Sequence, residues 1–155
     1  MYLLDEDGLA QLTVDDLDGL DAFEYISGAG VLKNVLSASK DFTLRYGRLT
    51  REKPFLVFSA TDGCFGYIPS PMEFEALLLD TLLEADSMAA FEAHLREELC
   101  QIAEDDFSLV GAAFGYGTFD SMKASLVQRW NALLKTYISR ISRTDPDSRK
   151  RLGDR

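Results

Sequence analysis

The chain has 155 residues, 46% of them hydrophobic and 27% charged, a size and balance typical of one soluble globular domain. Its formal net charge of -10 argues against nucleic acids and membrane surfaces as partners, because both attract basic proteins. Two cysteines without metal-binding spacing, and an N-terminus without signal-peptide features, predict a cytoplasmic protein.

The first predicted element is a hairpin. Apolar residues 1–4 and 9–13 flank the acidic stretch 5–8, which ends in Asp-Gly, a pair that favours a tight turn. The acidic residues of this stretch do not have the spacing of calcium ligands, so we interpret them as turn residues. Farther along, alternating apolar and polar residues over 42–48 are typical of a half-buried strand.

The middle of the chain predicts a strand and then two helices. Residues 55–58 are all apolar, as in a strand covered on both faces, and the strand stops at Thr-Asp-Gly in 61–63. The segment 70–73 (SPME) has the serine, proline and glutamate of a capped helix start and predicts a helix over 71–85. Apolar residues at spacings of three and four predict a second helix over 87–104.

The C-terminal part predicts a further strand and a long helix. Residues 107–114 are mostly apolar and predict another buried strand, which follows an acidic stretch. Helical spacing of apolar residues predicts a helix over 118–141, and the polar composition of 142–155 predicts a disordered tail. The expected organisation is therefore one domain over 1–117, an appended helix and the tail.

Acidic residues stand at the ends of two predicted buried strands: Asp62 after the first, and Asp105 with Asp106 before the second. Carboxylates that converge at a sheet end repel each other unless a cation or a proton compensates their charge. Mg²⁺ and Mn²⁺ prefer oxygen ligands and retain waters, which suits phosphate chemistry. The spacing alone favours a plainer interpretation, in which Asp62 and Asp105 only cap turns or helices.

Three segments resemble the PPM (type 2C) family of metal-dependent serine/threonine protein phosphatases. Residues 55–63 (FLVFSATDG) are similar to that family's buried strand and Ser/Thr-Asp-Gly motif, and 105–109 (DDFSL) to its late Asp-Asn/Asp-x-Ser/Thr strand. Residues 2–15 are similar to its Tyr-containing strand and Gly-Leu-x-Gln-Leu-Thr-x-Asp stretch. The resemblance covers about 2–114, and the predicted helix after Gly117 has no counterpart in it.

The resemblance implies an α+β fold, an antiparallel β-sandwich flanked by helices, with its N-terminal part missing. It implies hydrolysis of phosphoserine or phosphothreonine in proteins by two Mn²⁺ or Mg²⁺ ions, with a metal-bridging water as the nucleophile and no catalytic side chain in this chain. Asp62 and Asp105 would be metal ligands, Gly63 would let the loop turn tightly beside the ion, and Asp106 would support the site.

The family's early acidic ligand and its Asp-x-Gly-Gly and Gly-Asp-Ser-Arg segments have no match here. We therefore expect weak metal binding and little or no activity from this chain alone, and the missing N-terminal half is an expected partner beside the phosphoprotein substrate. Two alternatives remain open. The chain is a noncatalytic pseudophosphatase-like binding or regulatory module, or it is an unrelated α/β domain in which the matches are coincidental.

Overall fold

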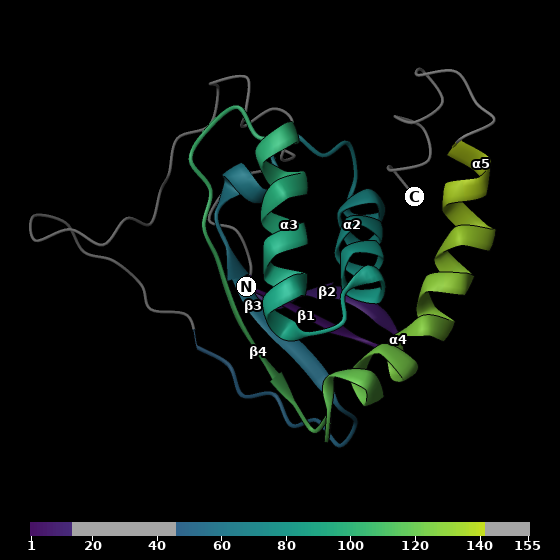
Figure 1. Cartoon of the computed structure of the whole chain (residues 1–155). Helices are drawn as coiled ribbons and strands as arrows, with labels where there is room; N and C mark the ends of the chain where they lie inside the picture. The colour runs from purple at the N-terminus through teal and green to yellow at the C-terminus, as the bar shows by residue number, and fades with distance from the viewer. Residues whose placement is uncertain (14–45, 142–155) are drawn as a thin grey trace, which may run out of the picture. The chain divides into compact units, whose positions relative to one another are not determined.

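A computed structural model describes residues 1–13 and 46–141. The chain divides into two compact units, one formed by 1–12 and 53–155 and the other by 13–52. All described helices and strands belong to the first unit (Figure 1). In the second unit the described residues form no helix or strand, and the strand predicted over 42–48 lies mostly outside the described part of the chain.

One antiparallel sheet forms the base of the first unit. Its strands lie in the order β2-β1-β3-β4, so that β1 and β3 are central and β2 and β4 are at the edges. The strands are β1 (Tyr2–Asp5), β2 (Gly8–Gln11), β3 (Phe55–Ala60) and β4 (Leu109–Phe114).

The predicted N-terminal hairpin is confirmed. β1 pairs with β2 in a register that sets Asp5 opposite Gly8, so the turn consists of Glu6 and Asp7. The Asp5 carboxylate accepts a hydrogen bond from the backbone N–H of Asp7 at 2.9 Å, which is the local bonding that favours aspartate in turns. Gly8 has a φ of 119°, a conformation open to glycine at little cost.

Two helices cover one face of the sheet: α2 (Pro71–Glu84) and α3 (Met88–Ile102) (Figure 1). Their predicted starts are confirmed. The Ser70 hydroxyl accepts the backbone N–H of Glu73 at 3.2 Å, and proline occupies the first helical position. Ser87 caps α3 in the same way through the N–H of Ala90, also at 3.2 Å.

The predicted C-terminal helix is also confirmed, with an irregular turn. Thr118 and Ser121 form a reciprocal capping box at the start of α4 (Phe119–Leu133). The helix continues through a π-helical turn, η3 (Leu134–Ile138), into the short α5 (Ser139–Ile141). The π-helical turn brings the Tyr137 hydroxyl to 2.6 Å from the Ser70 hydroxyl at the start of α2.

The hydrophobic core draws on the sheet and on all three long helices. Side chains from α4 are as deeply buried as those of the sheet and of α2, so α4 is packed into this core. Most of the core residues on the helices belong to the predicted apolar stripes. The core as a whole includes Leu4, Leu56, Phe58, Phe74, Leu78, Leu79, Leu82, Leu95, Leu99, Met122, Leu126 and Leu133.

A buried ion pair joins α2 to α4. Glu75 is 1% exposed, and its carboxylate accepts two hydrogen bonds from Arg129, at 2.5 Å from Nε and 2.7 Å from Nη2. The hydrogen bond that the Arg129 guanidinium donates to Glu75 raises the pKa of this guanidinium above its ordinary value. The same guanidinium lies against Gly8, where an added Cβ atom would collide with it. Arg129 therefore links α4 to α2 and to the hairpin.

The prediction that β4 is buried is wrong. The strand begins at Leu109, lies at the edge of the sheet, and is exposed from Val110 to Phe114, with Val110 73% exposed. A continuous apolar run indicates a strand but does not say whether the strand has neighbours on both sides. β3 has neighbouring strands on both sides, but the prediction that both of its faces are covered is met only in part, because Leu56 and Phe58 are buried whereas Phe55 and Val57 are half-buried.

The described residues thus form an α+β structure with one four-stranded antiparallel sheet and three long helices. Within the described ranges, no helix combines the length and the hydrophobicity needed to cross a membrane.

Candidate functional site

The acidic residues singled out by the sequence lie in two loops at one end of the sheet. β3 and β4 are antiparallel, and Ala60 at the end of β3 is opposite Leu109 at the start of β4. Asp62 follows β3, in a short 3-10 turn called η2 (Asp62–Cys64). Asp105 and Asp106 lie between α3 and β4. The antiparallel pairing therefore places both acidic loops at the same sheet end.

Thr61 and Ser108 fasten the two loops together. The backbone N–H of Thr61 donates to the Ser108 carbonyl oxygen at 3.0 Å, and the N–H of Ser108 donates to Thr61 Oγ1 at 2.9 Å. The Cys64 thiol donates to the same carbonyl at 3.2 Å. These bonds continue the strand pairing beyond its last residue pair. They hold in place the backbone of the two loops that carry the acidic groups.

Gly63 is where the loops approach most closely. A Cβ atom at position 63 would collide with the backbone carbonyl oxygen of Asp106 and come within 3.2 Å of the Phe107 side chain. Gly63 is buried. The Asp106 oxygen that lies against it belongs to the backbone and cannot move aside as a flexible side chain could. Loop packing alone thus requires glycine here, independently of any bound ion.

Each loop holds its leading carboxylate by a local bond. Asp62 Oδ1 accepts the N–H of Gly63 at 3.0 Å, and Asp105 Oδ1 accepts the N–H of Asp106 at 2.8 Å. These are the turn-stabilising contacts that the plainer interpretation predicts. All three aspartates are exposed, and a carboxylate has a second oxygen. The turn-stabilising role therefore leaves the aspartates able to bind a cation.

The donor set suits a hard cation only in part. Asp62, Asp105 and Asp106 offer carboxylate oxygens, the ligand type that Mg²⁺ and Mn²⁺ prefer. In the part of the chain that the structure describes, no group of three or more acidic, histidine or cysteine side chains is arranged to hold a metal. These loops would therefore need water, phosphate or further protein groups to complete the coordination of an ion.

Sequence reasoning missed the residues that join the loops. Thr61 and Ser108 belong to the resembling segments, but their mutual bonding depends on pairing across 47 positions of the chain. No sequence pattern indicates that Cys64 helps to join the loops. Its side chain is 1% exposed, and burial raises the pKa of its thiol, so the neutral form that donates to Ser108 is favoured.

Comparison with known proteins adds no assignment. No protein-family model matches the sequence, and no curated protein or solved structure is significantly similar to it. Function is therefore inferred from the geometry of the two loops.

Proposed function

We propose that this chain is the C-terminal part of a PPM-type phosphatase domain, which removes phosphate from phosphoserine or phosphothreonine in proteins. The observation that carries the proposal is the joining of the Asp62 and Asp105–Asp106 loops through Thr61 and Ser108. The two acidic motifs of the resemblance lie at one sheet end, and a phosphatase of this type needs its acidic ligands close together. The sandwich form of the fold is part of the same proposal.

In this proposal Asp62 and Asp105 hold the cation, and Asp106 adds negative charge beside it. A Mn²⁺ or Mg²⁺ ion, when bound, activates water and binds the phosphoryl oxygens. The protein's contribution is to hold the acidic groups in place. Thr61, Ser108 and Cys64 fix the loop backbones, and Gly63 lets the loops pack closely. Carboxylates on such a fixed backbone need little rearrangement when the cation arrives.

The proposal also concerns the remaining metal ligands, the cellular compartment and the substrate. Because the described ligands are incomplete, further acidic groups would come from a polypeptide segment outside the described residues. The two cysteines are both free thiols, which favours a reducing compartment such as the cytoplasm. A phosphoprotein substrate would approach the sheet end that carries the acidic loops.

Manganese binding tests the metal site directly. Electron paramagnetic resonance of a Mn²⁺ titration is expected to show weak binding to the intact chain. In NMR spectra, Mn²⁺ should broaden the amide signals of residues 61–64 and 105–108 before others. Asp62→Asn should weaken this binding by at least about tenfold, because one of few charged ligands is lost.

Asp120→Asn is the matched control. Asp120 is an exposed aspartate in the first turn of α4, beyond the opposite end of β4, and its loss should leave the manganese affinity unchanged. Equal affinities of the Asp62→Asn variant and the unmodified chain would refute the metal site. That result would favour a noncatalytic binding module.

Activity provides the second test. With Mn²⁺, the isolated chain is expected to release little or no phosphate from a phosphoserine peptide, because part of the ligand set is absent. Rapid metal-dependent turnover by this chain alone would contradict our account of the ligands. Turnover that persists in excess chelator would contradict the metal mechanism itself.

A further inference from the structure

Among the strands that the structure describes, β4 has a neighbour on one side only. β4 pairs with β3 along one side, and along the other side no described strand pairs with it. Its sequence, LVGAAF, has no charge and no proline, and residues 110–114 are exposed. Sheet edges are normally protected by charges, prolines, bulges or a covering segment, because exposed backbone groups attract a further strand. β4 has neither charge nor proline to prevent strand addition.

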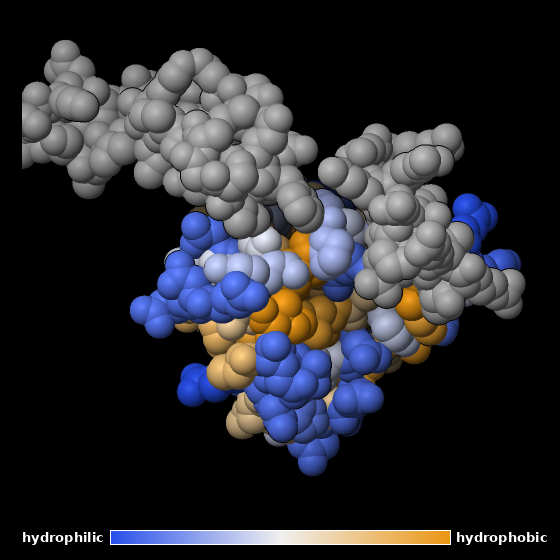
Figure 2. Space-filling model, turned by 90° about the horizontal axis from the view of Figure 1, so that it is seen from above, coloured by the Kyte–Doolittle hydropathy of each residue, from blue (hydrophilic) through white to orange (hydrophobic). Residues whose placement is uncertain are grey.

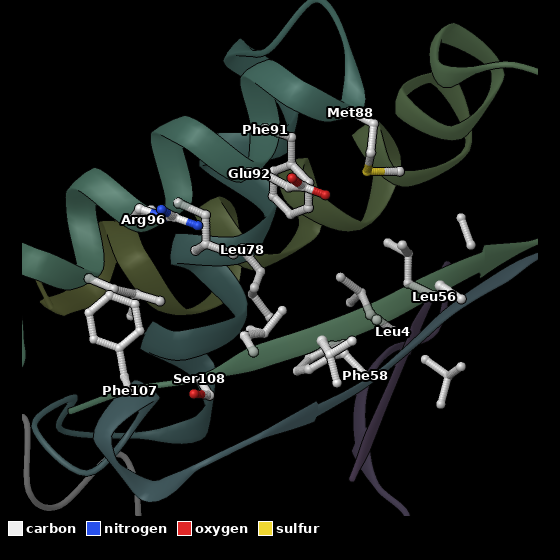
Figure 3. A pocket seen from close by; sticks show the side chains of 18 of the residues that line it. Leu4, Leu56, Phe58, Leu78, Met88, Phe91, Glu92, Arg96, Phe107 and Ser108 are labelled. Atoms are coloured by element: carbon white, nitrogen blue, oxygen red, sulfur yellow. The ribbon is translucent and has the colours of Figure 1, made fainter.

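A cavity of about 590 Å³ lies beside this edge, between the sheet and α3 (Figure 3). Met88 and Phe91 extend into it from α3, and Leu56 and Phe58 line it from the sheet (Figure 3). Glu92 and Arg96 of α3 also border it. Its lining is thus mainly apolar, with charged groups on the helix side. Figure 2 likewise shows hydrophobic residues among hydrophilic ones on one face of the molecule.

Small residues of β4 account for this space. Gly111 lies opposite Phe58 and Ala113 opposite Leu56, so both are on the sheet face that α2 and α3 cover. A Cβ atom on Gly111 would come within 2.9 Å of the Phe58 Cβ atom and of the Val57 carbonyl oxygen, so a larger residue cannot replace it. The side chains of Gly111 and Ala113 therefore leave the space between α3 and β4 unfilled.

We propose that an extended segment of another polypeptide adds to the open edge of β4 as a fifth strand, and that its large apolar side chains enter this cavity. Strand addition would satisfy the open backbone groups of β4. On the side facing α3, alternate residues of the added strand would cover Met88 and Phe91. The partner is thus a segment with large apolar residues at every second position. This proposal goes beyond the phosphatase assignment and does not depend on it.

A second copy of this chain fits the edge less well. If β4 paired with another β4, the side chains nearest the cavity would again include Gly111 and Ala113, which are too small to fill it. Two copies would also each bring a net charge of -10 to the interface. Both observations favour a different polypeptide with larger side chains.

A synthetic peptide tests the proposal. The fluorescein-labelled peptide KTLTFTLTK places Leu, Phe and Leu on one face of a strand, whereas KTTLLFTTK has the same composition without alternation. Fluorescence anisotropy is expected to show at least about tenfold tighter binding of the alternating peptide to the unmodified chain. Hydrogen exchange should then show new protection of amides in β4. Equal affinities, or binding without protection in β4, would overturn the proposal.

Two variants locate the binding. Ala113→Phe places a ring on the cavity side of β4 and should weaken binding of KTLTFTLTK at least about tenfold. Ala112→Phe adds the same ring on the opposite face and should preserve the affinity, because neighbouring residues of a strand face opposite ways. Equal binding by both variants, with circular dichroism confirming that they fold, would place the peptide elsewhere. The exchange measurement on the unmodified chain decides the matter if either variant fails to fold.

Two other occupants would overturn the proposal. A second copy would appear in light scattering as a concentration-dependent dimer with protected β4 amides and no peptide binding. A small amphipathic ligand would appear as dodecanoate binding that Ala113→Phe abolishes, again without peptide binding.

Discussion

At the scale of single residues, Gly63 shows how a site motif can serve packing. The glycine admits the Asp106 carbonyl oxygen into van der Waals contact with the other loop. A methyl group there has to displace backbone that is held by the Thr61–Ser108 hydrogen bonds. Backbone displacement of this kind typically costs more than the small entropic gain of replacing glycine by alanine.

We therefore predict that Gly63→Ala lowers the free energy of unfolding by about 1–3 kcal/mol. Urea denaturation followed by circular dichroism measures the change. Gly117→Ala is the control, because a Cβ atom at Gly117 has no atom within 4 Å, and we expect it to change stability by less than about 0.5 kcal/mol. Similar effects of the two substitutions would show that close loop packing is not what position 63 requires.

Cys64 and Cys100 should differ sharply in reactivity. Cys100 is exposed, whereas the Cys64 thiol is buried and hydrogen-bonded, and burial raises its pKa. Thiolate is the reactive form, so a thiol reagent such as dithionitrobenzoate should modify one cysteine rapidly in the folded chain and the second only in urea. Cys100→Ala should remove the rapid phase. A rapid phase that survives in Cys100→Ala would contradict the described environment of Cys64.

The raised pKa of Cys64 also makes the free energy of unfolding depend on pH. The folded state favours the neutral thiol, so this contribution is complete below the unfolded pKa, about 8.5, and declines as pH rises toward the folded value. Cys64→Ala should remove that part of the decline in alkaline solution.

At the scale of elements, α4 is fixed by the pairing of Glu75 with Arg129. Both charges lie mostly out of solvent, with side chains 2% and 25% exposed. Removing one partner leaves the other desolvated and uncompensated, which usually costs several kcal/mol. Replacing both by apolar residues of similar size leaves no such charge.

We predict that Glu75→Leu destabilises the chain by about 3 kcal/mol, measured by urea denaturation. The double variant Glu75→Leu with Arg129→Met should recover most of this loss. Glu97→Leu, on an exposed position of α3, is the single-site control and should change stability little. Additive losses in the double variant would mean that the two charges do not depend on each other.

The elements also show what local sequence can predict. Caps and turns depend on neighbouring residues, so the Asp-Gly hairpin and the capped start at Ser70 were predictable. The exposure of β4 depends on whether another strand lies beside it, which its own residues do not encode. The burial of Glu75 depends on Arg129, which lies 54 positions farther along the chain, so the local sequence does not predict it.

The candidate site likewise has features that the local sequence predicts and features that it does not. The positions of Asp62 and Asp105 at strand ends followed from hydrophobic patterns, and the antiparallel pairing of β3 with β4 brings their loops together. The bonds from Ser108 to Thr61 and Cys64 depend on the register between distant strands, which no local pattern specifies.

At the scale of the whole molecule, the excess of acidic residues should make stability depend on salt. The chain has 26 acidic and 16 basic residues, and unscreened repulsion among the acidic residues opposes the compact state. Raising NaCl from about 20 to about 150 mM shortens the screening length to about 8 Å. We predict a higher urea midpoint at the higher salt concentration, and a lower midpoint would show that attractive pairs outweigh the repulsion.

Because of the π-helical turn η3, the contact of Tyr137 with α2 depends on the number of residues in the C-terminal helix as well as on their types. A π turn holds one residue more than an α turn, and here it brings the Tyr137 hydroxyl to the serine that starts α2. Deleting a single residue of α4 ahead of this turn, with the turn retained, would rotate Tyr137 by roughly 100° about the helix axis. Homologues that conserve this contact should therefore tolerate substitutions around Tyr137 more readily than insertions or deletions.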